Sequence, residues 1–268
     1  MIRLVCVDVD GTLVGSSGRV DPETWLAADR ARAAGVSLAI CTGRPGFGIT
    51  RSYAERLSPE GWHIFQNGAS IMHLPSGDSR SMALDPRAVG LLVNRSRETG
   101  RLLELYSDDD YAVETDSPVS RAHAALIGVP FHTRSFSSLT TPIVRAQWLV
   151  SETELASVSA EPRAGLELSR STSPVMPGIQ FVNLTPPGVD KASAVRAVAG
   201  AYGVSLGEVM FVGDGSNDAI AMRIVGVPVA MANADTDALA VATHVVGDVD
   251  RGGLIEALSL ATSFAAAH

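Results

Sequence analysis

Two aspartates end an apolar run near the start of the chain. The run begins at Leu4 and is followed by Asp8, Val9, Asp10 and Gly11. On an extended chain the side chains at positions i and i+2 point to the same face, so these two carboxylates should lie close together. They repel each other unless a cation joins them, which makes the pair a candidate for metal-assisted chemistry.

Further polar residues stand where a predicted strand ends or a predicted helix begins. Thr42-Gly43-Arg44 follows the second strand, Lys191 begins a helix, and residues 213–218 (Gly-Asp-Gly-Ser-Asn-Asp) follow a later strand. Ligands of open parallel sheets bind beyond the carboxyl ends of the strands, so these residues should gather at one edge. They would bring together four carboxylates, those of Asp8, Asp10, Asp214 and Asp218. Such a cluster favours a hard divalent cation, and oxygen ligands with room for water suit Mg²⁺.

The residue types fit phosphoryl transfer. With the cation present, Asp8 can be ionised and act as a nucleophile, and Asp10 can protonate the leaving oxygen and later deprotonate water. Lys191, the Thr42 hydroxyl and the backbone N–H groups of Asp10 and Gly43 would stabilise charge on the transferring group. Each motif alone is more often a turn or a solvated charge. Their order along the chain, each at a strand end or a helix start, favours the chemical interpretation.

Alternating strands and helices must position these residues. Buried apolar runs predict strands, and capped periodic segments predict helices, in both terminal parts of the chain. In the N-terminal part the expected strands are 5–9, 36–41, 63–66 and 69–72, and the expected helices begin at Pro22, with Asp21 as cap, and span 46–57. In the C-terminal part the expected helices are 191–202, 218–225, 236–243 and 253–267, and the expected strands are 208–212, 228–231 and 244–246. This alternation predicts a Rossmann-like, doubly wound parallel sheet.

The stretch between these parts has a different pattern. It reads as an α+β insert with helices near 86–99, 119–127 and 152–159 and strands near 102–106, 111–114, 143–150, 166–169 and 179–184. Paired strands with helices to one side predict an antiparallel sheet covered on one face. We therefore expect a core domain formed by residues 1–82 plus 185–268 and an inserted cap domain formed by residues 83–184.

Composition narrows the possible partners. The 268 residues carry a net charge of −8, so no general positive field attracts nucleic acid or anionic lipid. No apolar run approaches the roughly 20 residues of a membrane span, and the N-terminal residues lack the pattern of a secretory signal. Cys6 and Cys41 lie in apolar stretches, which suits buried thiols in a reducing compartment. These features predict a cytoplasmic protein that binds neither nucleic acid nor membrane. The sequence leaves the oligomeric state open between a monomer and a loose dimer.

The four motifs resemble, in order, those of haloacid dehalogenase-like phosphatases. Further stretches resemble the Cof-type subgroup, namely residues 66–69, 188–191, 230–234 and 250–253. The resemblance implies a mobile cap over a Rossmann-like core, with Asp8 as nucleophile and Asp10 as general acid and base. It also implies that Asp8, the Asp10 carbonyl and Asp214 bind Mg²⁺ with support from Asp218. The implied phosphate-binding residues are Thr42, Gly43, Lys191 and Asn217.

The spacing of the motifs indicates the cap type. Little beyond one helix and one strand fits between Asp10 and Thr42, whereas the insert lies between the second and third motifs, which corresponds to a C2-type cap. Family members so built act mostly on small phosphorylated metabolites such as sugar phosphates. In the insert, side chains that could recognise a substrate's polar end are Arg121, His123, Arg134 and Arg145, for which solvated surface charge is the favoured interpretation. Three other histidines lack metal-ligand spacing and are expected to be structural: His63, His73 and His244.

The sequence leaves two other functions open. A phosphosugar mutase would use the same aspartates but return the phosphoryl group to a sugar. A catalytically idle regulatory module could keep the fold and the Mg²⁺ site, although such a protein would usually have lost the nucleophile or the acid and base. The resemblance to phosphatases favours hydrolysis.

Overall fold

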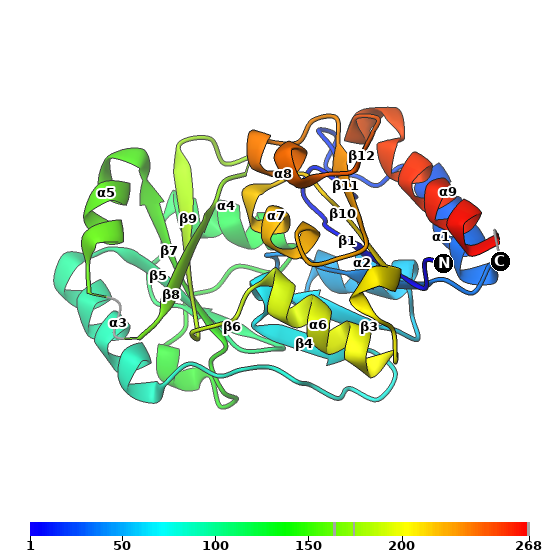
Figure 1. Ribbon diagram of the computed structural model, residues 1–268. Helices are drawn as coiled ribbons and strands as arrows, with labels where there is room; N and C mark the ends of the chain where they lie inside the picture. Colours follow the sequence, from blue (N-terminus) through cyan, green and yellow to red (C-terminus); the bar gives the residue numbers. More distant parts are fainter. Residues whose placement is uncertain (163–164, 174, 267–268) are drawn as a thin grey trace. The chain divides into compact units, whose positions relative to one another are not determined.

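The computed structural model describes residues 1–162, 165–173 and 175–266 of the chain (Figure 1). The chain divides into two units. The first, which we call the core unit, comprises Met1–Gly43, Ser52–Arg80 and the chain from Asp190 onward. The second, which we call the insert unit, comprises Arg44–Arg51 and Ser81–Val189. Each unit has its own sheet.

Five parallel strands form the sheet of the core unit. Their order is β12-β11-β10-β1-β2, so the first strand pairs with a strand from each end of the sequence. The strands are β1 (Leu4–Val7), β2 (Ser37–Ile40), β10 (Val209–Gly213), β11 (Val227–Met231) and β12 (His244–Val246). All the pairings are parallel, and β1 is in register with β10 so that Val7 lies opposite Val212. The predicted parallel sheet is confirmed, but the expected strands 63–66 and 69–72 do not belong to it.

Helices cover both faces of this sheet (Figure 1). On one face, two long helices and the end of α2 (Ile49–Leu57) pack with the apolar side chains of β1, β2 and β10, and three helices pack on the other. The first pair is α1 (Pro22–Ala33) and α9 (Gly253–Ala266), and the second group is α6 (Lys191–Ala201), α7 (Ser216–Met222) and α8 (Thr236–Val241). Residue 267, which the sequence placed at the end of the last helix, lies outside the described residues. Burial on both faces explains why the strands read as continuous apolar runs.

Local signals fix the ends of α1. The Asp21 side chain accepts a hydrogen bond from the Glu23 amide, and Pro22 occupies the first turn. Proline is suited to that position because its missing N–H has no partner there. Gly35 follows the helix with a φ of +83°, a left-handed conformation that glycine adopts without strain. The expected start of this helix is confirmed.

Strands β3 (Trp62–Phe65) and β4 (Ser70–His73) form a separate antiparallel pair. They are joined to the parallel sheet by a single bridge between Cys41 and Ile64. The connection between them is the 3-10 turn Gln66–Gly68. Helix α2 (Ile49–Leu57), which precedes β3, begins later than the expected residue 46, after Gly48 with its φ of +62°.

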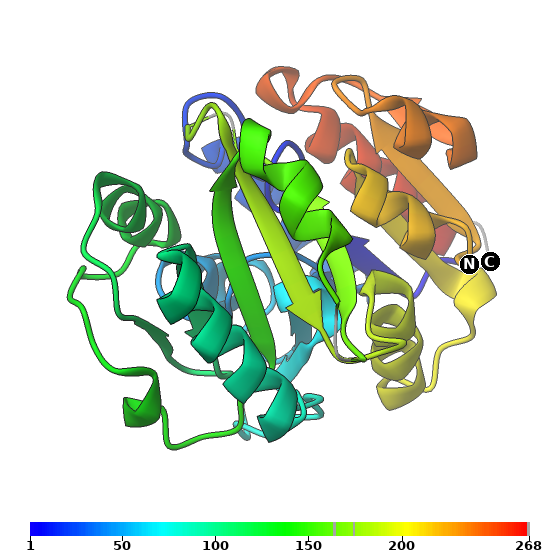
Figure 2. The same cartoon turned by 90° about the vertical axis from the view of Figure 1, so that its left-hand side faces the viewer.

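The insert unit holds an antiparallel sheet of order β6-β5-β7-β9-β8. Its strands are β5 (Leu102–Tyr106), β6 (Tyr111–Val113), β7 (Arg145–Ser151), β8 (Glu167–Ser171) and β9 (Ile179–Thr185). Helices α3 (Pro86–Thr99) and α5 (Glu152–Ala160) pack on one face (Figure 2). Helix α4 (Pro118–Ile127) packs on the other face, with Ile127 among the side chains of Tyr106, Leu149 and Phe181. The expectation that helices cover one face only was therefore wrong for α4.

Within the described part of the chain, no helix combines the length and apolarity needed to cross a membrane.

Candidate active site

Three carboxylates meet at the carboxyl edge of the parallel sheet. Asp8 follows the last residue of β1, Asp214 follows the last residue of β10, and Asp218 lies in the first turn of α7. Because β1 and β10 are neighbouring parallel strands, Asp8 and Asp214 leave the sheet side by side. One oxygen of each of the three carboxylates lies within 4.8 Å of the others. We call these three residues the carboxylate cluster.

Lys191 joins the carboxylate cluster from the first position of α6. Its side chain is only 1% exposed, and its ammonium donates to Asp8 Oδ1 at 2.7 Å and to Asp218 Oδ1 at 2.6 Å. The other oxygen of Asp218 accepts hydrogen bonds from the backbone N–H groups of Asp214 and Gly215 at 3.0 and 2.9 Å. Asp218 therefore fixes both the lysine and the loop after β10.

The charges in this cluster do not balance. Burial, followed by the negative charge of Asp218, raises the pKa of Asp8 well above its usual value, although Lys191 opposes that shift. The same two causes, burial first, raise the pKa of Asp214 to about 7. Burial disfavours the ammonium form of Lys191, but Asp218 and Asp8 outweigh it and raise its pKa. One ammonium thus faces two buried carboxylates and a half-buried third, and the surplus of charge is negative.

This surplus fits a divalent cation. Carboxylate oxygens are the ligands that Mg²⁺ prefers, and an added positive charge would remove the repulsion that raises the pKa values of Asp8 and Asp214. Thr12 also donates from its hydroxyl to Asp214 Oδ1 at 3.2 Å, which orients that carboxylate. The donor set of this chain therefore matches the predicted metal.

Asp10 lies at the edge of the carboxylate cluster. Its side chain is exposed, and its carboxylate is not among the three that come within 4.8 Å of one another. Its negative charge nevertheless contributes to the raised pKa values of Asp8 and Asp214. Exposure leaves the Asp10 carboxyl accessible to proton transfer with a substrate or with water.

The remaining predicted phosphate-binding residues gather around Asn67. The carbonyl of Thr42 accepts from the Asn67 N–H at 2.9 Å, and the Asn217 amide donates to Asn67 Oδ1 at 3.1 Å. A Cβ on Gly43 would lie 3.1 Å from the Asn67 amide. The charges of Lys191, Asp218 and Asp8 all act on the thiol of Cys41, which directly precedes Thr42. The phosphate-binding residues around Asn67 therefore lie near the carboxylate cluster.

Two glycines bring other chain segments against the loop after β1. A Cβ on Gly11, whose φ is +77°, would stand 2.1 Å from Asp214 Oδ2, so only glycine allows the loop to approach the carboxylate. A Cβ on Gly15 would stand 2.0 Å from Asp250 Oδ1. The Asn233 side chain donates to the Gly11 carbonyl at 2.8 Å and accepts from the Val249 N–H at 2.9 Å. The loop that carries Asp10 is thus held by residues distant in sequence.

Sequence reasoning missed the contacts of Asn67 and Asn233. Both stood in stretches that resembled the Cof-type subgroup, but Asn67 was placed only in the short connection between the expected strands 63–66 and 69–72. The signal that could have found them is an asparagine beside a chain reversal, where its short amide can bond the backbone of another segment.

Two of the candidate side chains in the insert unit are buried, not solvated as expected. His123 is 5% exposed and shares a hydrogen bond of 2.7 Å with Glu104 Oε2. Arg145 is 3% exposed and donates to Asn183 Oδ1 at 2.9 Å. Their partners come from other strands, which compensates the cost of burial. The other two candidates lie at the surface, as expected. Arg121 forms an ion pair with Asp116, and Arg134 forms one with Asp110.

The three histidines that were expected to be structural have structural contacts. His63 is buried, accepts from the Ile40 N–H at 3.0 Å, and bonds the Ser58 carbonyl at 2.9 Å through its other ring nitrogen. His73 contacts Ser76 and the ring of Trp62. His244 contacts Thr243. None of them belongs to the carboxylate cluster within the described ranges.

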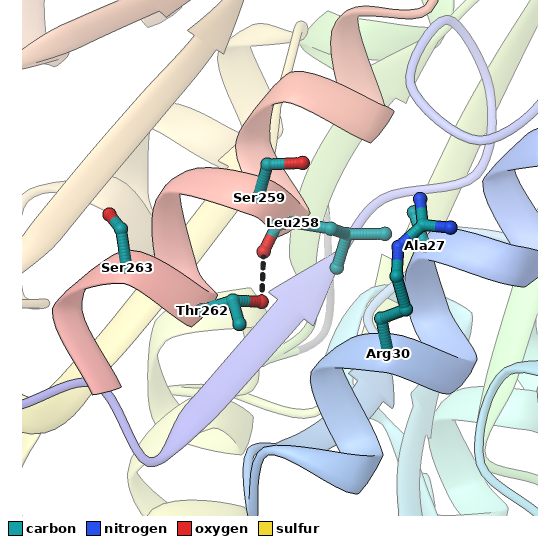
Figure 3. A pocket seen from close by; sticks show the side chains of 6 residues that line it. All are labelled: Ala27, Arg30, Leu258, Ser259, Thr262 and Ser263. Carbon is teal, nitrogen blue, oxygen red and sulfur yellow. Dashed lines mark hydrogen bonds between the residues drawn. The ribbon is translucent and has the colours of Figure 1, made fainter. Parts of the chain in front are cut away.

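A hollow of about 270 Å³ lies between α1 and α9 (Figure 3). It is lined by Ala27, Arg30, Leu258, Ser259, Thr262 and Ser263. All three hydroxyls donate to carbonyls of their own helix, at 2.7 to 2.8 Å. Since the lining includes no residue of the carboxylate cluster and its hydroxyls are already bonded, the hollow offers no catalytic groups.

Comparison with known proteins places the chain in a family. The sequence profile of the haloacid dehalogenase-like hydrolases matches residues 5–258. The chain therefore belongs to this family, and it is an enzyme of the haloacid dehalogenase phosphatase type. The predicted resemblance is confirmed.

Individual relatives match almost end to end. An HMP-PP phosphatase of Cronobacter sakazakii is 25% identical over 254 residues, which cover 94% of this chain and 92% of that protein. A haloacid dehalogenase-like hydrolase from Bacteroides thetaiotaomicron has a similar fold, with a TM-score of 0.85 and 22% identity over 97% of this chain and 99% of that one. A subclass IIB sugar phosphatase of the superfamily is also similar in fold, with a TM-score of 0.81 and 23% identity over 96% and 98% of the two chains.

Proposed function

We propose that this protein is a Mg²⁺-dependent phosphomonoester hydrolase that works through an aspartyl-phosphate intermediate. The observation that carries the proposal is the carboxylate cluster with its buried lysine, at the edge of the sheet where ligands of such folds bind. A buried surplus of negative charge is unfavourable in a purely structural role. It is suited to a site that receives a cation and a phosphoryl group together.

Asp8 is the nucleophile in this proposal. One of its carboxylate oxygens forms a bond to phosphorus while the bond from phosphorus to the leaving oxygen breaks, and Asp10 gives its proton to that oxygen. In the second step Asp10 takes a proton from a water molecule, whose oxygen bonds to phosphorus and releases Asp8. The ammonium of Lys191 at 2.7 Å from Asp8 Oδ1 holds the nucleophile in place.

Asp8, Asp214 and the carbonyl of Asp10 would hold Mg²⁺, and Asp218 would support them. When bound, the cation would neutralise charge on the carboxylates and on the phosphoryl oxygens. Thr42, Gly43, Lys191 and Asn217 would bind the phosphoryl group through a hydroxyl, a backbone N–H, an ammonium and an amide.

We further propose that the substrate is a small phosphorylated metabolite, a sugar phosphate or a similar compound. The names of two similar proteins, an HMP-PP phosphatase and a sugar phosphatase, support a small substrate. The presence of a separate α+β insert unit supports it as well, because the family members that resemble this chain and are built in this way act mostly on small phosphorylated metabolites.

We also propose a reducing, cytoplasmic location. Both cysteines, Cys6 and Cys41, are free and fully buried, and burial raises the pKa of the Cys6 thiol to about 12. Buried thiols of this kind are unreactive, and free cysteines without a disulfide are typical of proteins in a reducing compartment.

The test is phosphate release from p-nitrophenyl phosphate and from a panel of sugar phosphates, with Mg²⁺ and with EDTA. We expect activity only with Mg²⁺ and a loss of at least about 10³-fold in Asp8→Asn, because the amide is not a nucleophile. Asp237→Asn, at an exposed position in the first turn of α8, is the matched control and should keep wild-type activity. Persistent turnover in Asp8→Asn contradicts the proposal. Phosphorus NMR of a hexose 1-phosphate separates hydrolysis from a mutase reaction, which would move the phosphoryl group without releasing phosphate.

A further inference from the structure

The turn after β3 is built in an unusual backbone conformation. Gln66 and Asn67 have φ values of +54° and +56°, and they are the non-glycine residues with positive φ in the described ranges. Side chains disfavour this left-handed region, and residues held there cluster at functional sites. Gln66 is fully buried and Asn67 is 6% exposed. The surroundings must therefore impose this conformation on two buried residues in succession.

The turn connects three segments that the proposed function uses. The Asn67 N–H donates to the Thr42 carbonyl, and Asn67 Oδ1 accepts from the Asn217 amide at 3.1 Å. The next residue packs on the start of α6, because a Cβ on Gly68 would lie 2.2 Å from the Asp190 carbonyl, directly before Lys191. A single turn thus touches the end of β2, the start of α7 and the start of α6.

We propose that Asn67 is a positioning residue that orients the Asn217 amide and the peptide between Thr42 and Gly43 toward the phosphoryl group. This inference rests on the proposed function, in which these three residues bind phosphate. The Asn217 amide has two N–H bonds. With one donated to Asn67 Oδ1, the other is turned to a fixed direction, and the amide cannot rotate to present its oxygen to an anion.

The left-handed conformation is part of this arrangement. At a negative φ the Asn67 side chain would leave the Asn217 amide, so the backbone strain maintains the contact. A simpler explanation is that asparagine stands here only because it tolerates this conformation better than most residues. The two explanations predict different results for glycine, which adopts a positive φ without strain but has no amide.

Asn67→Gly therefore separates stability from activity. If the residue serves only the turn, the variant keeps wild-type activity with an equal or higher melting temperature. If Asn67 orients Asn217, we expect kcat/KM to fall about 10-fold or more and the inhibition constant of inorganic phosphate to rise several-fold, with a melting temperature no lower than that of the wild type. Gln66→Gly is the control for the backbone strain, because it relieves the strain one residue earlier and leaves the Asn67 amide in place. It also removes a fully buried side chain, so a lower melting temperature is expected for this control alone.

A double-mutant cycle tests whether Asn67 acts through Asn217. In the background of Asn217→Ala, Asn67→Gly should cause little further loss, because the amide it orients is gone. Equal losses in both backgrounds would overturn the inference, and so would wild-type kcat/KM and phosphate inhibition in Asn67→Gly.

Failure of the proposed function would give a different result from failure of the inference about Asn67. In that case the wild type does not turn over phosphomonoesters, or Asp8→Asn remains active, whatever Asn67 does. Binding of inorganic phosphate in the presence of Mg²⁺, measured by calorimetry, needs no turnover. Weaker binding to Asn67→Gly than to Gln66→Gly supports the inference, whereas equal binding, or no binding to the wild type, contradicts it.

Discussion

Replacing Lys191 with methionine removes the ammonium from the carboxylate cluster while filling a similar volume. Asp8 and Asp218 then lose a partner that lies 2.7 and 2.6 Å from their oxygens. Removing one partner of a buried ion pair usually costs about 3–5 kcal/mol, because the other charge stays buried without compensation. Asp214 adds a third carboxylate here. We therefore expect a loss of free energy of unfolding toward the upper end of that range, in EDTA at about pH 8.

The loss should shrink as the pH falls. The pKa of Asp8 is raised in the folded protein by burial and by Asp218, and losing the ammonium raises it further. A carboxyl with a raised pKa in the folded state favours folding at low pH, and this contribution is lost as the pH rises through the folded value. At about pH 5 the cluster takes up protons and needs less counter-charge, so variant and wild type should differ less there.

Saturating Mg²⁺ should restore part of the stability at the higher pH. A ligand at 100 times its dissociation constant stabilises the folded state by about 2.7 kcal/mol. Urea denaturation followed by circular dichroism, in EDTA and in Mg²⁺ at both pH values, measures all four conditions. Arg145→Met removes another buried cation, in the insert unit, and its cost should not depend on Mg²⁺. If Lys191→Met matched the wild type in EDTA at the higher pH, the charge argument for the site would be refuted.

Gly11→Ala should cost about 1–2 kcal/mol for its left-handed backbone, plus a steric cost from the contact with Asp214, and reduce activity. Gly18→Ala, with a φ of +67° and open space around its Cβ, should show the backbone cost alone in the same unfolding experiment, and equal costs would contradict the contact. Asn233→Ala should lose about 0.5–1.5 kcal/mol per hydrogen bond and raise the Mg²⁺ concentration for half-maximal activity, whereas Asn94→Ala on the exposed side of α3 should change neither. In EDTA the wild type should lose stability as the pH rises from about 4 to 7, because folded Asp214, with its pKa of about 7, keeps a proton that the unfolded chain releases. Asp214→Asn should flatten this slope in denaturation curves, and an unchanged slope would show that another group causes it.

The parallel sheet and its chemical edge could be predicted because both depend on local patterns. Apolar runs mark strands buried on two faces, and the polar residues directly after them must lie at the carboxyl edge. The strand order could not be predicted, because β1 pairs with β10 through residues about 200 positions apart, such as Val7 and Val212. Hence the motifs indicated which carboxylates gather. They did not indicate that the Lys191 ammonium donates hydrogen bonds to both Asp8 and Asp218.

Contacts made by single polar side chains were harder to anticipate. Asn67 reads as a hairpin residue because Asn-Gly is a strong turn signal, and its bond to Asn217 depends on the arrangement of the whole core unit. His123 and Arg145 read as surface residues because a charge or a ring is buried only when another segment supplies a partner. Those partners, Glu104 and Asn183, come from other strands of the insert unit, and no local pattern reveals them.

Lys191 is the only lysine in the 268 residues, so the sole side-chain amine of this protein is the one held inside the carboxylate cluster. Amine-directed reagents, such as acylating agents and bifunctional cross-linkers, should therefore modify no lysine of the folded protein as long as Lys191 stays buried. Incorporating isotopically labelled lysine would give one side-chain resonance, at the proposed reaction centre. The arrival of a cation, a phosphate mimic or a substrate at that centre could then be followed through one signal, without mutation or chemical tagging.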